Sequence, residues 1–186
     1  MKITCISGSP TAGGNNEKLL NIVLGMAGER GFDTDKVFLS KLDVEPCTDC
    51  GICKKVKECP IGDDMNDIYK TLETSDALIV ISPVFFGSMS AQLKALLDRT
   101  ILLRRNGFLL KGKLGAAVAI GGSRNGGQEF TVQGIHSWMH IHGMVIVGDA
   151  AHFGGIAVKP VDSDDVGLKT VRDTVNMVCD TLSRLR

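Results

Sequence analysis

The sequence predicts an α/β protein built on a doubly wound parallel sheet. Short aliphatic and β-branched runs recur along the chain, and amphipathic helical patterns lie between them. Strands that alternate with helices over this length favour a parallel sheet that is covered by helices on both faces. The composition, 44% hydrophobic and 23% charged, is ordinary for one buried core. We therefore expect a single domain over residues 1–186.

The strands and helices can be placed by their periodicity. Five runs read as strands buried on both faces: Ile3–Ile6, Val37–Leu39, Ala77–Ser82, Leu114–Ile120 and Met144–Val147. Apolar residues at helical spacing predict helices around Leu19–Met26, Met65–Leu72, Leu93–Ile101, Gln128–His142 and Val171–Leu185. The last of these helices has Ser163 as its expected cap, with Asp164 and Asp165 in its first turn. Five strands favour the flavodoxin-like order 2-1-3-4-5, in which ligands bind beyond the carboxyl ends of the strands.

Charge and hydropathy exclude several kinds of partner. Lys plus Arg and Asp plus Glu number 21 each, so no overall field attracts nucleic acid or anionic lipid. No apolar run approaches the roughly 20 residues of a membrane-spanning helix. The opening run Met1–Ile6 is too short for a signal-peptide core. These features predict a soluble cytoplasmic protein without nucleic-acid or membrane partners.

The loop that follows the first strand has the composition of a phosphate site. Residues 7–16 read Ser-Gly-Ser-Pro-Thr-Ala-Gly-Gly-Asn-Asn and lead into the first helix. Free N–H groups and the positive end of a helix dipole favour an anion there. The loop lacks the Gly-Lys-Ser/Thr ending of a P-loop and the Gly-x-Gly-x-x-Gly of a dinucleotide fold, so a monophosphate ester fits it better. A plain turn with a helix cap is the alternative.

Two further loops are expected at the same edge of the sheet. Strand three ends in Ser-Pro-Val-Phe-Phe-Gly-Ser-Met-Ser over residues 82–90, and strand four ends in Gly-Gly-Ser-Arg-Asn-Gly-Gly over residues 121–127. Glycines let the backbone approach a flat ring. Phe85 or Phe86 is able to cover a ring edge, although paired aromatics beside a strand end are more often core residues. The three loops together predict a phosphorylated aromatic cofactor.

These residues also carry a family resemblance. Ser-Gly-Ser-Pro with the downstream Gly-Asn-Asn, and the run from Ser82 to Thr100, resemble the NADPH-dependent FMN reductase family of flavodoxin-like proteins over nearly the whole chain. The resemblance implies FMN as cofactor. It implies that the phosphate lies toward Ser7, Ser9, Thr11, Asn15 and Asn16, the isoalloxazine along Pro83, Val84, Phe85, Phe86 and Gly87, and its pyrimidine end at Gly121, Gly122, Ser123 and Arg124.

A compact cysteine motif points to a second redox centre. Cys47, Cys50, Cys53 and Cys59 form C-x2-C-x2-C-x5-C before Pro60. Such close spacing suits a cubane, whose irons each take one thiolate, better than one tetrahedral zinc ion. We therefore favour a 4Fe-4S cluster, with zinc and a redox disulfide as alternatives. The connection over residues 40–62 is long for a compact domain, as expected if it holds the cluster. Cys5 and Cys179 lie on apolar segments and read as small buried hydrophobes.

A cysteine motif within such a chain resembles the iron-sulfur flavoproteins. That resemblance implies a redox enzyme that relays electrons between FMN and a 4Fe-4S cluster, without a catalytic side chain. Ferredoxin or NAD(P)H is the implied donor, and a homodimer or homotetramer is the implied assembly. A cluster-free NAD(P)H-dependent FMN or quinone reductase and a flavodoxin-like electron carrier remain alternatives. Lys54, Lys55 and Lys57 in the cysteine segment read as a solvated surface or as a docking site for an acidic redox protein.

Overall fold

The computed structural model describes residues 1–185, which are built around a six-stranded sheet. The strands run in the order β2-β1-β3-β4-β5, with β6 also paired to β4, and every pairing is parallel. Their bounds are β1 Lys2–Ser7, β2 Asp33–Phe38, β3 Ala77–Pro83, β4 Leu114–Gly121, β5 Val145–Ile146 and β6 Gly155–Val158. The predicted order 2-1-3-4-5 is confirmed.

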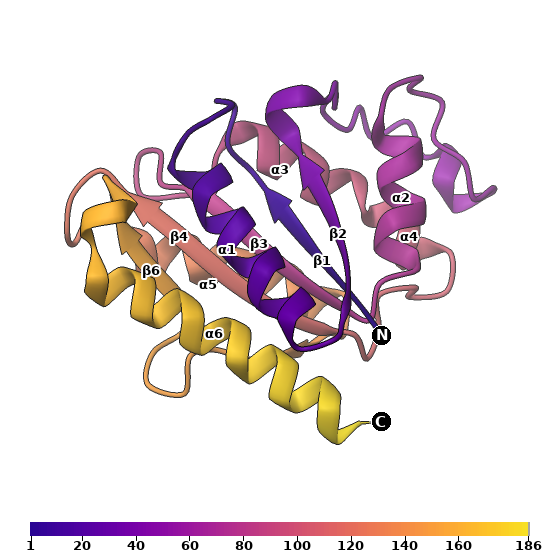
Figure 1. Ribbon diagram of the computed structural model, residues 1–186. Coiled ribbons are helices and arrows are strands. Elements are labelled where there is room, and N and C mark those ends of the chain that lie inside the picture. The colour runs from indigo at the N-terminus through magenta and orange to yellow at the C-terminus, as the bar shows by residue number, and fades with distance from the viewer. Residues whose placement is uncertain (186) are drawn as a thin grey trace.

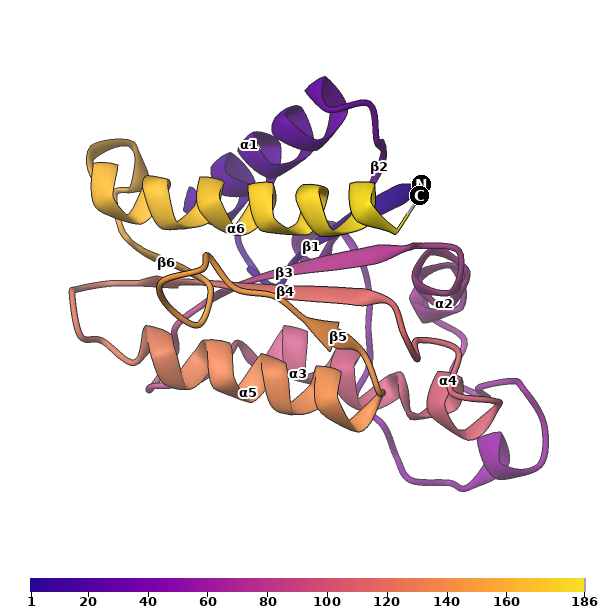
Figure 2. The same ribbon diagram turned by 90° about the horizontal axis from the view of Figure 1, so that it is seen from below.

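Helices cover both faces of the sheet, as Figures 1 and 2 show. One layer holds α1 and α6, and the other holds α3 and α5, with α2 and α4 toward one end. The α-helices are α1 Asn15–Glu29, α2 Met65–Glu73, α3 Ala91–Arg99, α4 Ile101–Arg105, α5 Gln128–Ile141 and α6 Asp165–Arg184. Short 3-10 turns are η1 Leu39–Lys41, η2 Ile52–Lys54 and η3 Val161–Ser163. None of the helices within residues 1–185 is both long and apolar enough to cross a membrane.

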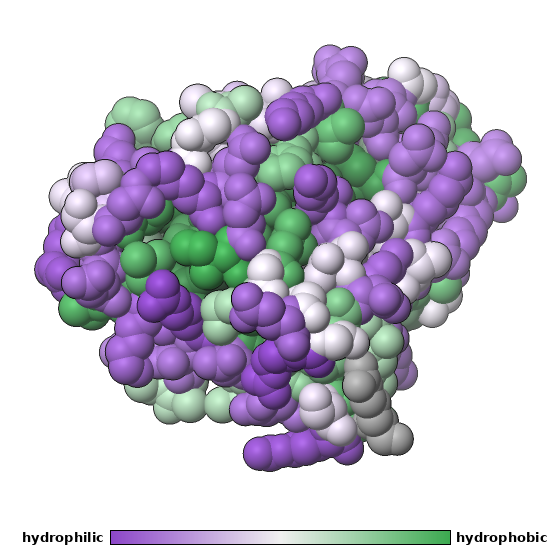
Figure 3. Space-filling view, viewed as in Figure 1, coloured by the Kyte–Doolittle hydropathy of each residue, from purple (hydrophilic) through white to green (hydrophobic). Residues whose placement is uncertain are grey.

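Each face of the sheet has its own hydrophobic core. Under α1 and α6, side chains such as Leu19, Val23 and Val175 pack on alternate residues of β1, β3 and β4. Under α2, α3 and α5, Leu72, Leu96 and other apolar side chains pack on the opposite strand faces. The central strands β3 and β4 are buried almost throughout, which explains why they read as continuous apolar runs. Figure 3 shows the α1 and α6 face, where apolar side chains surface in a hollow among hydrophilic ones.

The fifth position of the sheet is filled by two short strands instead of the expected single one. Residues 114–115 of β4 pair with β5, and residues 118–121 pair with β6. The chain leaves the sheet between them in a loop where Ala150 has a φ of +70°. That loop begins at Gly148 and closes at Gly154, whose hypothetical Cβ would meet the carbonyl oxygen of Ala117 at 2.4 Å. Only glycine fits where this loop rejoins β4.

Three other expected boundaries were wrong. The second strand starts at Asp33 instead of Val37, because a charged edge strand lacks the apolar run of a central one. The helix expected through Ile101 is divided at Thr100, whose hydroxyl donates back to the carbonyl of Leu97. The cap of α6 is Asp164, not Ser163: its carboxylate accepts from the N–H of Gly167 at 3.1 Å.

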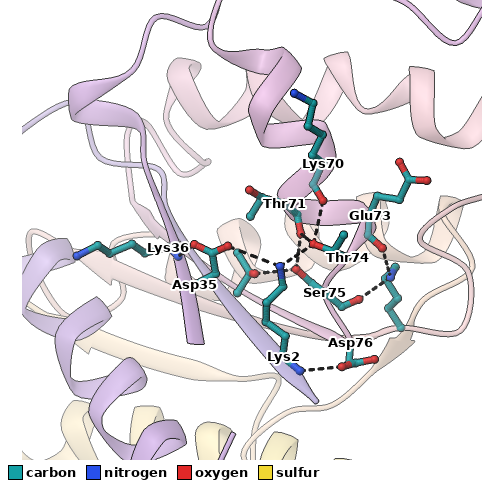
Figure 4. A network of polar contacts seen from close by, with 11 residues as sticks. Lys2, Asp35, Lys36, Lys70, Thr71, Glu73, Thr74, Ser75 and Asp76 are labelled. Carbon is teal, nitrogen blue, oxygen red and sulfur yellow. Dashed lines mark hydrogen bonds and ion pairs between the residues drawn. The ribbon is translucent and has the colours of Figure 1, made fainter. Parts of the chain in front are cut away.

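A polar network closes the amino-terminal edge of the sheet (Figure 4). Lys2 donates from its backbone N–H to Asp76 at 2.7 Å and from Nζ to the hydroxyl of Thr74 at 2.6 Å. The hydroxyl of Ser75 donates to the carbonyl of Thr71 at 2.6 Å. These bonds tie the end of α2 to the start of β1, and they leave the carboxyl edge of the sheet as the open one.

Candidate functional site

The three expected loops, which we call the strand-end loops (residues 7–16, 82–90 and 121–127), lie side by side. Backbone bonds join the strand ends: the N–H of Gly8 donates to the carbonyl of Ile81 at 2.8 Å, and that of Val84 to Ile120 at 2.9 Å. A Cβ at Gly127 would lie 2.6 Å from Cα of Gly87. The second and third loops are therefore in direct backbone contact.

The first strand-end loop presents free backbone donors. The hydroxyl of Ser9 accepts from the N–H of Thr11 at 3.1 Å, which tightens the turn. Gly14 is the N-cap of α1 and offers no side chain to cap it, so the N–H groups of the first helical turn have no intrahelical acceptor. The N–H of Gly13 already donates to the carboxylate of Glu17 at 2.7 Å. The loop thus favours an anion, as expected for a phosphate.

The asparagines of this loop are engaged with the protein itself. Oδ1 of Asn15 accepts from the N–H of Val161 at 2.9 Å, and Nδ2 of Asn16 lies 3.4 Å from the carbonyl of Ile81. Asn16 is 4% exposed and Ser7 is 3% exposed. Thr11 is exposed at the rim of the loop. The asparagine side chains therefore hold the loop in place, and its backbone donors are left for a ligand.

The second strand-end loop is a tight hairpin turn with an aromatic tip. The N–H of Phe85 donates to Ser88 at 2.8 Å and the N–H of Ser88 to Phe85 at 3.1 Å. Phe86 and Gly87 at the tip have φ of +49° and +75°, which is the left-handed geometry of a two-residue type I′ turn. Phe85 is 48% exposed and Phe86 is fully exposed, which rules out the alternative that these paired aromatics belong to the core. They face solvent beside the carboxyl edge, while Pro83 and Val84 are half-buried beneath them.

The third strand-end loop is held from below by Gln128. Nε2 of Gln128 donates to the carbonyl of Ser123 at 2.8 Å, and a Cβ at Gly121 would meet Nε2 at 2.1 Å. Gly122 and Ser123 are exposed. Arg124 lines a cavity of about 180 Å³ between this loop, β6 and α6, together with Asp164. Arg124 therefore borders the α6 side of the loop.

The four motif cysteines surround one narrow hollow. Cys47, Cys50, Cys53 and Cys59 all line it, and α4 forms one wall. Among residues 1–185, no three His, Cys, Asp or Glu side chains are placed to hold a single metal ion. The hollow has a volume of about 20 Å³, which is room for about one water. Cys47 and Cys50 are exposed, whereas Cys53 and Cys59 are half-buried.

The donor chemistry around the cysteine sulfurs suits an anionic metal cluster. The N–H of Asp49 donates to Sγ of Cys47 at 3.4 Å, and Nη1 of Arg105 to Sγ of Cys53 at 3.0 Å. The hydrogen bond to Cys53 raises the pKa of Arg105. Burial raises the pKa of Tyr69, which also lines the hollow, to about 12. The hollow therefore joins thiols with fixed N–H donors and a guanidinium group.

A buried ion pair closes the base of the cysteine loop, which we define as residues 46–62. Asp63 accepts from Nη1 and Nη2 of Arg99 at 2.8 and 3.0 Å, and from the N–H of Glu45 at 2.9 Å. Burial alone would raise the pKa of Asp63, but the hydrogen bonds from Arg99 and from the backbone lower it. Burial would likewise lower the pKa of Arg99, and the bonds to Asp63 raise it instead. The loop is thus anchored at both ends by one arginine.

The two sites lie at opposite ends of α3. Its cap, Ser90, donates to the carbonyl of Gly8 in the first strand-end loop, and its last residue, Arg99, anchors the cysteine loop. Nine residues of helix at 1.5 Å each span about 14 Å. In Figure 2 the strand-end loops and the cysteine loop accordingly project from different ends of the molecule.

Sequence reasoning missed several residues of these sites. Gln128, Ser90, Arg99 and Arg105 each touch a predicted loop from a helix end. Ser90 was detectable as a Ser before a helical pattern. The other three carry no signal of their own, because an Arg or Gln at a helix end reads as surface.

Comparison with known proteins relates the chain to a family over most of its length. The family described as NADPH-dependent FMN reductase matches residues 1–157. An iron-sulfur flavoprotein of Methanosarcina thermophila is 54% identical over all of this chain and 97% of its own length. Another, from Methanocaldococcus jannaschii, is 44% identical with both chains fully covered. The solved structure of a flavodoxin, WrbA-like protein from Agrobacterium tumefaciens superposes with a TM-score of 0.71 at 15% identity, covering 100% of this chain and 98% of that one, which confirms the flavodoxin-like fold.

Proposed function

Because the chain belongs to the NADPH-dependent FMN reductase family and matches iron-sulfur flavoproteins along its whole length, we propose that it relays electrons between FMN and a 4Fe-4S cluster. Family membership makes the chain an FMN-dependent oxidoreductase. Beyond that activity, we propose the 4Fe-4S cluster, the electron relay and the redox partners. The observation that carries them is the pair of sites joined by α3, one of anion-binding backbone and one of thiols.

FMN is proposed to bind across the strand-end loops. The free N–H groups at the start of α1 would take its phosphate, with Ser7, Ser9, Thr11, Asn15 and Asn16 shaping that loop. The glycine backbone of the other two loops would lie along the ring. At Gly87, in the second loop, the space is open, because a Cβ there would meet nothing within 4 Å. Phe85 and Phe86 are exposed beside this edge and would cover the ring.

The cluster is proposed to bind through Cys47, Cys50, Cys53 and Cys59. All four line one hollow, with N–H donors to two of their sulfurs. Bound FMN exchanges one or two electrons and a 4Fe-4S cluster exchanges one at a time, which is what a relay requires. The protein's part would be to bind the two groups near opposite ends of α3 and to donate hydrogen bonds to the sulfurs.

NAD(P)H or a ferredoxin is the proposed electron donor, and a homodimer or homotetramer the proposed assembly. Lys54 and Lys55 are exposed on the cysteine loop, whereas Lys57 pairs with Glu73 at 2.7 Å. An acidic ferredoxin would meet the two unpaired lysines beside the cluster. Electron transfer from it should then slow as the salt concentration rises, and a rate independent of salt would reject this docking site.

Anaerobic purification with iron, sulfide and FMN analysis tests the proposal. We expect FMN together with about four irons and four sulfides per chain. Cys50→Ala should lose the iron and keep FMN, because Cys50 lines the cysteine hollow, at the other end of α3 from the strand-end loops. Cys179→Ala is the matched control: Cys179 lies on the buried face of α6, and the variant should retain both groups.

Three results would contradict the proposal in different ways. An iron-free protein with full NAD(P)H-dependent turnover would identify a cluster-free FMN or quinone reductase. A protein that exchanges electrons with partners without any turnover of its own would act as a carrier. Zinc in stoichiometric amount would assign the cysteines to a structural ion.

A further inference from the structure

We propose that Arg99 and Arg105 are positioning residues of the cysteine hollow, which donate hydrogen bonds to the bound cluster and stabilise its reduced form. The inference rests on the proposed function, because it requires a cluster in this hollow. It goes beyond that function by assigning the control of the cluster's reduction potential to two guanidinium groups on adjacent helices.

Arg105 already makes the contact that this role requires. Its Nη1 donates to Sγ of Cys53 at 3.0 Å across 52 positions of sequence. The next residue, Asn106, donates from Nδ2 to the carbonyl of Cys53 at 3.3 Å. Two consecutive side chains thus bind the same cysteine, one at its sulfur and one at its backbone. The end of α4 holds Cys53 in place by these two bonds.

Arg99 lines the same hollow and has a donor without a partner among the described residues. Both of its Nη atoms bind Asp63, and Nη1 also reaches the carbonyl of Glu45 at 2.8 Å. Its side chain is 1% exposed, yet its Nε has no hydrogen-bond partner within residues 1–185. A buried donor without an acceptor is costly, and Arg99 lines the hollow that the cysteines surround. A cluster sulfur is an acceptor that would complete the set.

The charge of the two groups favours the reduced cluster. A cluster held by four thiolates is anionic, and one-electron reduction adds one more negative charge. Guanidinium groups stay protonated, so they stabilise the more negative form. In the reaction the cluster gains the electron that a donor loses, and no bond or proton changes partners. Removing one guanidinium group should therefore make the cluster harder to reduce.

Redox titration of the holoprotein tests the inference, with dithionite as reductant and the cluster followed by electron paramagnetic resonance. Arg105→Gln should lower the equilibrium constant for one-electron reduction about tenfold, which is about 59 mV. Arg104→Gln is the matched control from the same helix. Its Nε bonds the carbonyl of Ile141 at 3.0 Å and its guanidinium group stacks on Phe108, away from the hollow. Neither variant should move the potential of FMN.

Two further variants separate charge from contact. Arg105→Lys keeps the charge and should recover part of the lost stabilisation. Arg99→Lys keeps a cation for Asp63 but has no donor at the Nε position. If circular dichroism shows that this variant is folded, the reduction potential of its cluster should also be lower than that of the wild type. If it does not fold, the Arg105 series alone decides the inference.

The possible failures can be told apart. An iron-free wild type would refute the proposed function itself. A loaded Arg105→Gln protein with the wild-type potential, or equal shifts in Arg104→Gln and Arg105→Gln, would overturn this inference and leave the proposed function standing.

Discussion

Arg99 and Asp63 form a two-point ion pair in which each side chain is 1% exposed. Asp63→Ala would leave the guanidinium group buried and unpaired, which typically costs about 3–5 kcal/mol. It would also remove the acceptor of the Glu45 N–H, although Arg99 would still donate to the carbonyl of Glu45. We expect a fall of that size in the free energy of unfolding, measured by urea denaturation of the metal-free protein.

Asp67→Ala is the control for this change. Asp67 pairs with Lys70 on α2, but its side chain is 88% exposed, so its loss should change stability by less than about 0.5 kcal/mol. Equal effects of the two substitutions would show that the buried pair does not hold the loop.

His142 should make the stability of the protein depend on pH. Its ring is buried beside Trp138, and Nε2 lies 2.9 Å from the hydroxyl of Thr100. Burial, and then the charge of Arg104, lower the pKa of His142 to about 4 from its ordinary 6.5. The unfolded chain then binds more protons between these values. The free energy of unfolding should be fully retained above pH 6.5 and fall by up to about 3 kcal/mol as the pH drops to 4.

Thermal unfolding of His142→Gln over this pH range measures that contribution. The variant does not titrate at position 142 and should show a flatter profile than the wild type. His140→Gln, on the exposed side of the same helix, should follow the wild-type profile. A wild-type slope preserved in His142→Gln would assign the pH dependence to other groups.

Gly127→Ala should separate the second and third strand-end loops. Gly127 has a φ of +104°, and its Cβ would lie 2.6 Å from Cα of Gly87. We expect FMN affinity, measured by quenching of flavin fluorescence, to fall about tenfold or more, since the ring is proposed to lie along both loops. In Gly28→Ala, on α1 with open space around it, FMN affinity should be unchanged and stability should rise by about 0.5–1 kcal/mol.

Phe86→Asn should weaken FMN binding without destabilising the fold. Phe86 has a φ of +49° and buries no surface, so Asn, which tolerates this conformation, should raise stability by up to about 1 kcal/mol. FMN affinity should fall about threefold or more if the ring is lost as a cover. Phe108→Asn is the matched control, with a φ of +54° far from the strand-end loops. Unchanged FMN affinity in Phe86→Asn would remove this side chain from the proposed site.

The carboxyl edge of the sheet could be predicted because its chemistry is local. Ser7 to Asn16 directly follow a buried strand, and parallel strands bring such loops together whatever the rest of the chain does. The cysteine site could also be predicted, because its four cysteines lie close together in the sequence. The bonds from Arg99 to Asp63 and Glu45 could not be predicted. Arg99 is 36 positions from Asp63 and 54 positions from Glu45, and a single arginine gives no sign of its partner.

The interrupted fifth position of the sheet was equally hidden. A strand of two residues, Val145–Ile146, gives no periodic signal, and Gly155–Val158 follows a loop whose left-handed Ala150 has no sequence signature. For Phe85 and Phe86 the sequence left a ring cover and a core pair as alternatives, because composition cannot distinguish an aromatic that packs from one at the tip of a turn.

The length of α3 is constrained at both of its ends. Its cap, Ser90, is bonded to Gly8 and its last residue, Arg99, to Asp63. The number of residues between these two contacts therefore fixes the distance and the rotation between them. Inserting one residue would advance its far end by about 1.5 Å and turn it by about 100°, which would swing Arg99 out of register with its carboxylate. Sequence changes within α3 are therefore restricted to substitutions, because an insertion or deletion would break one of the two contacts. The loops on either side of α3 remain free to change in length.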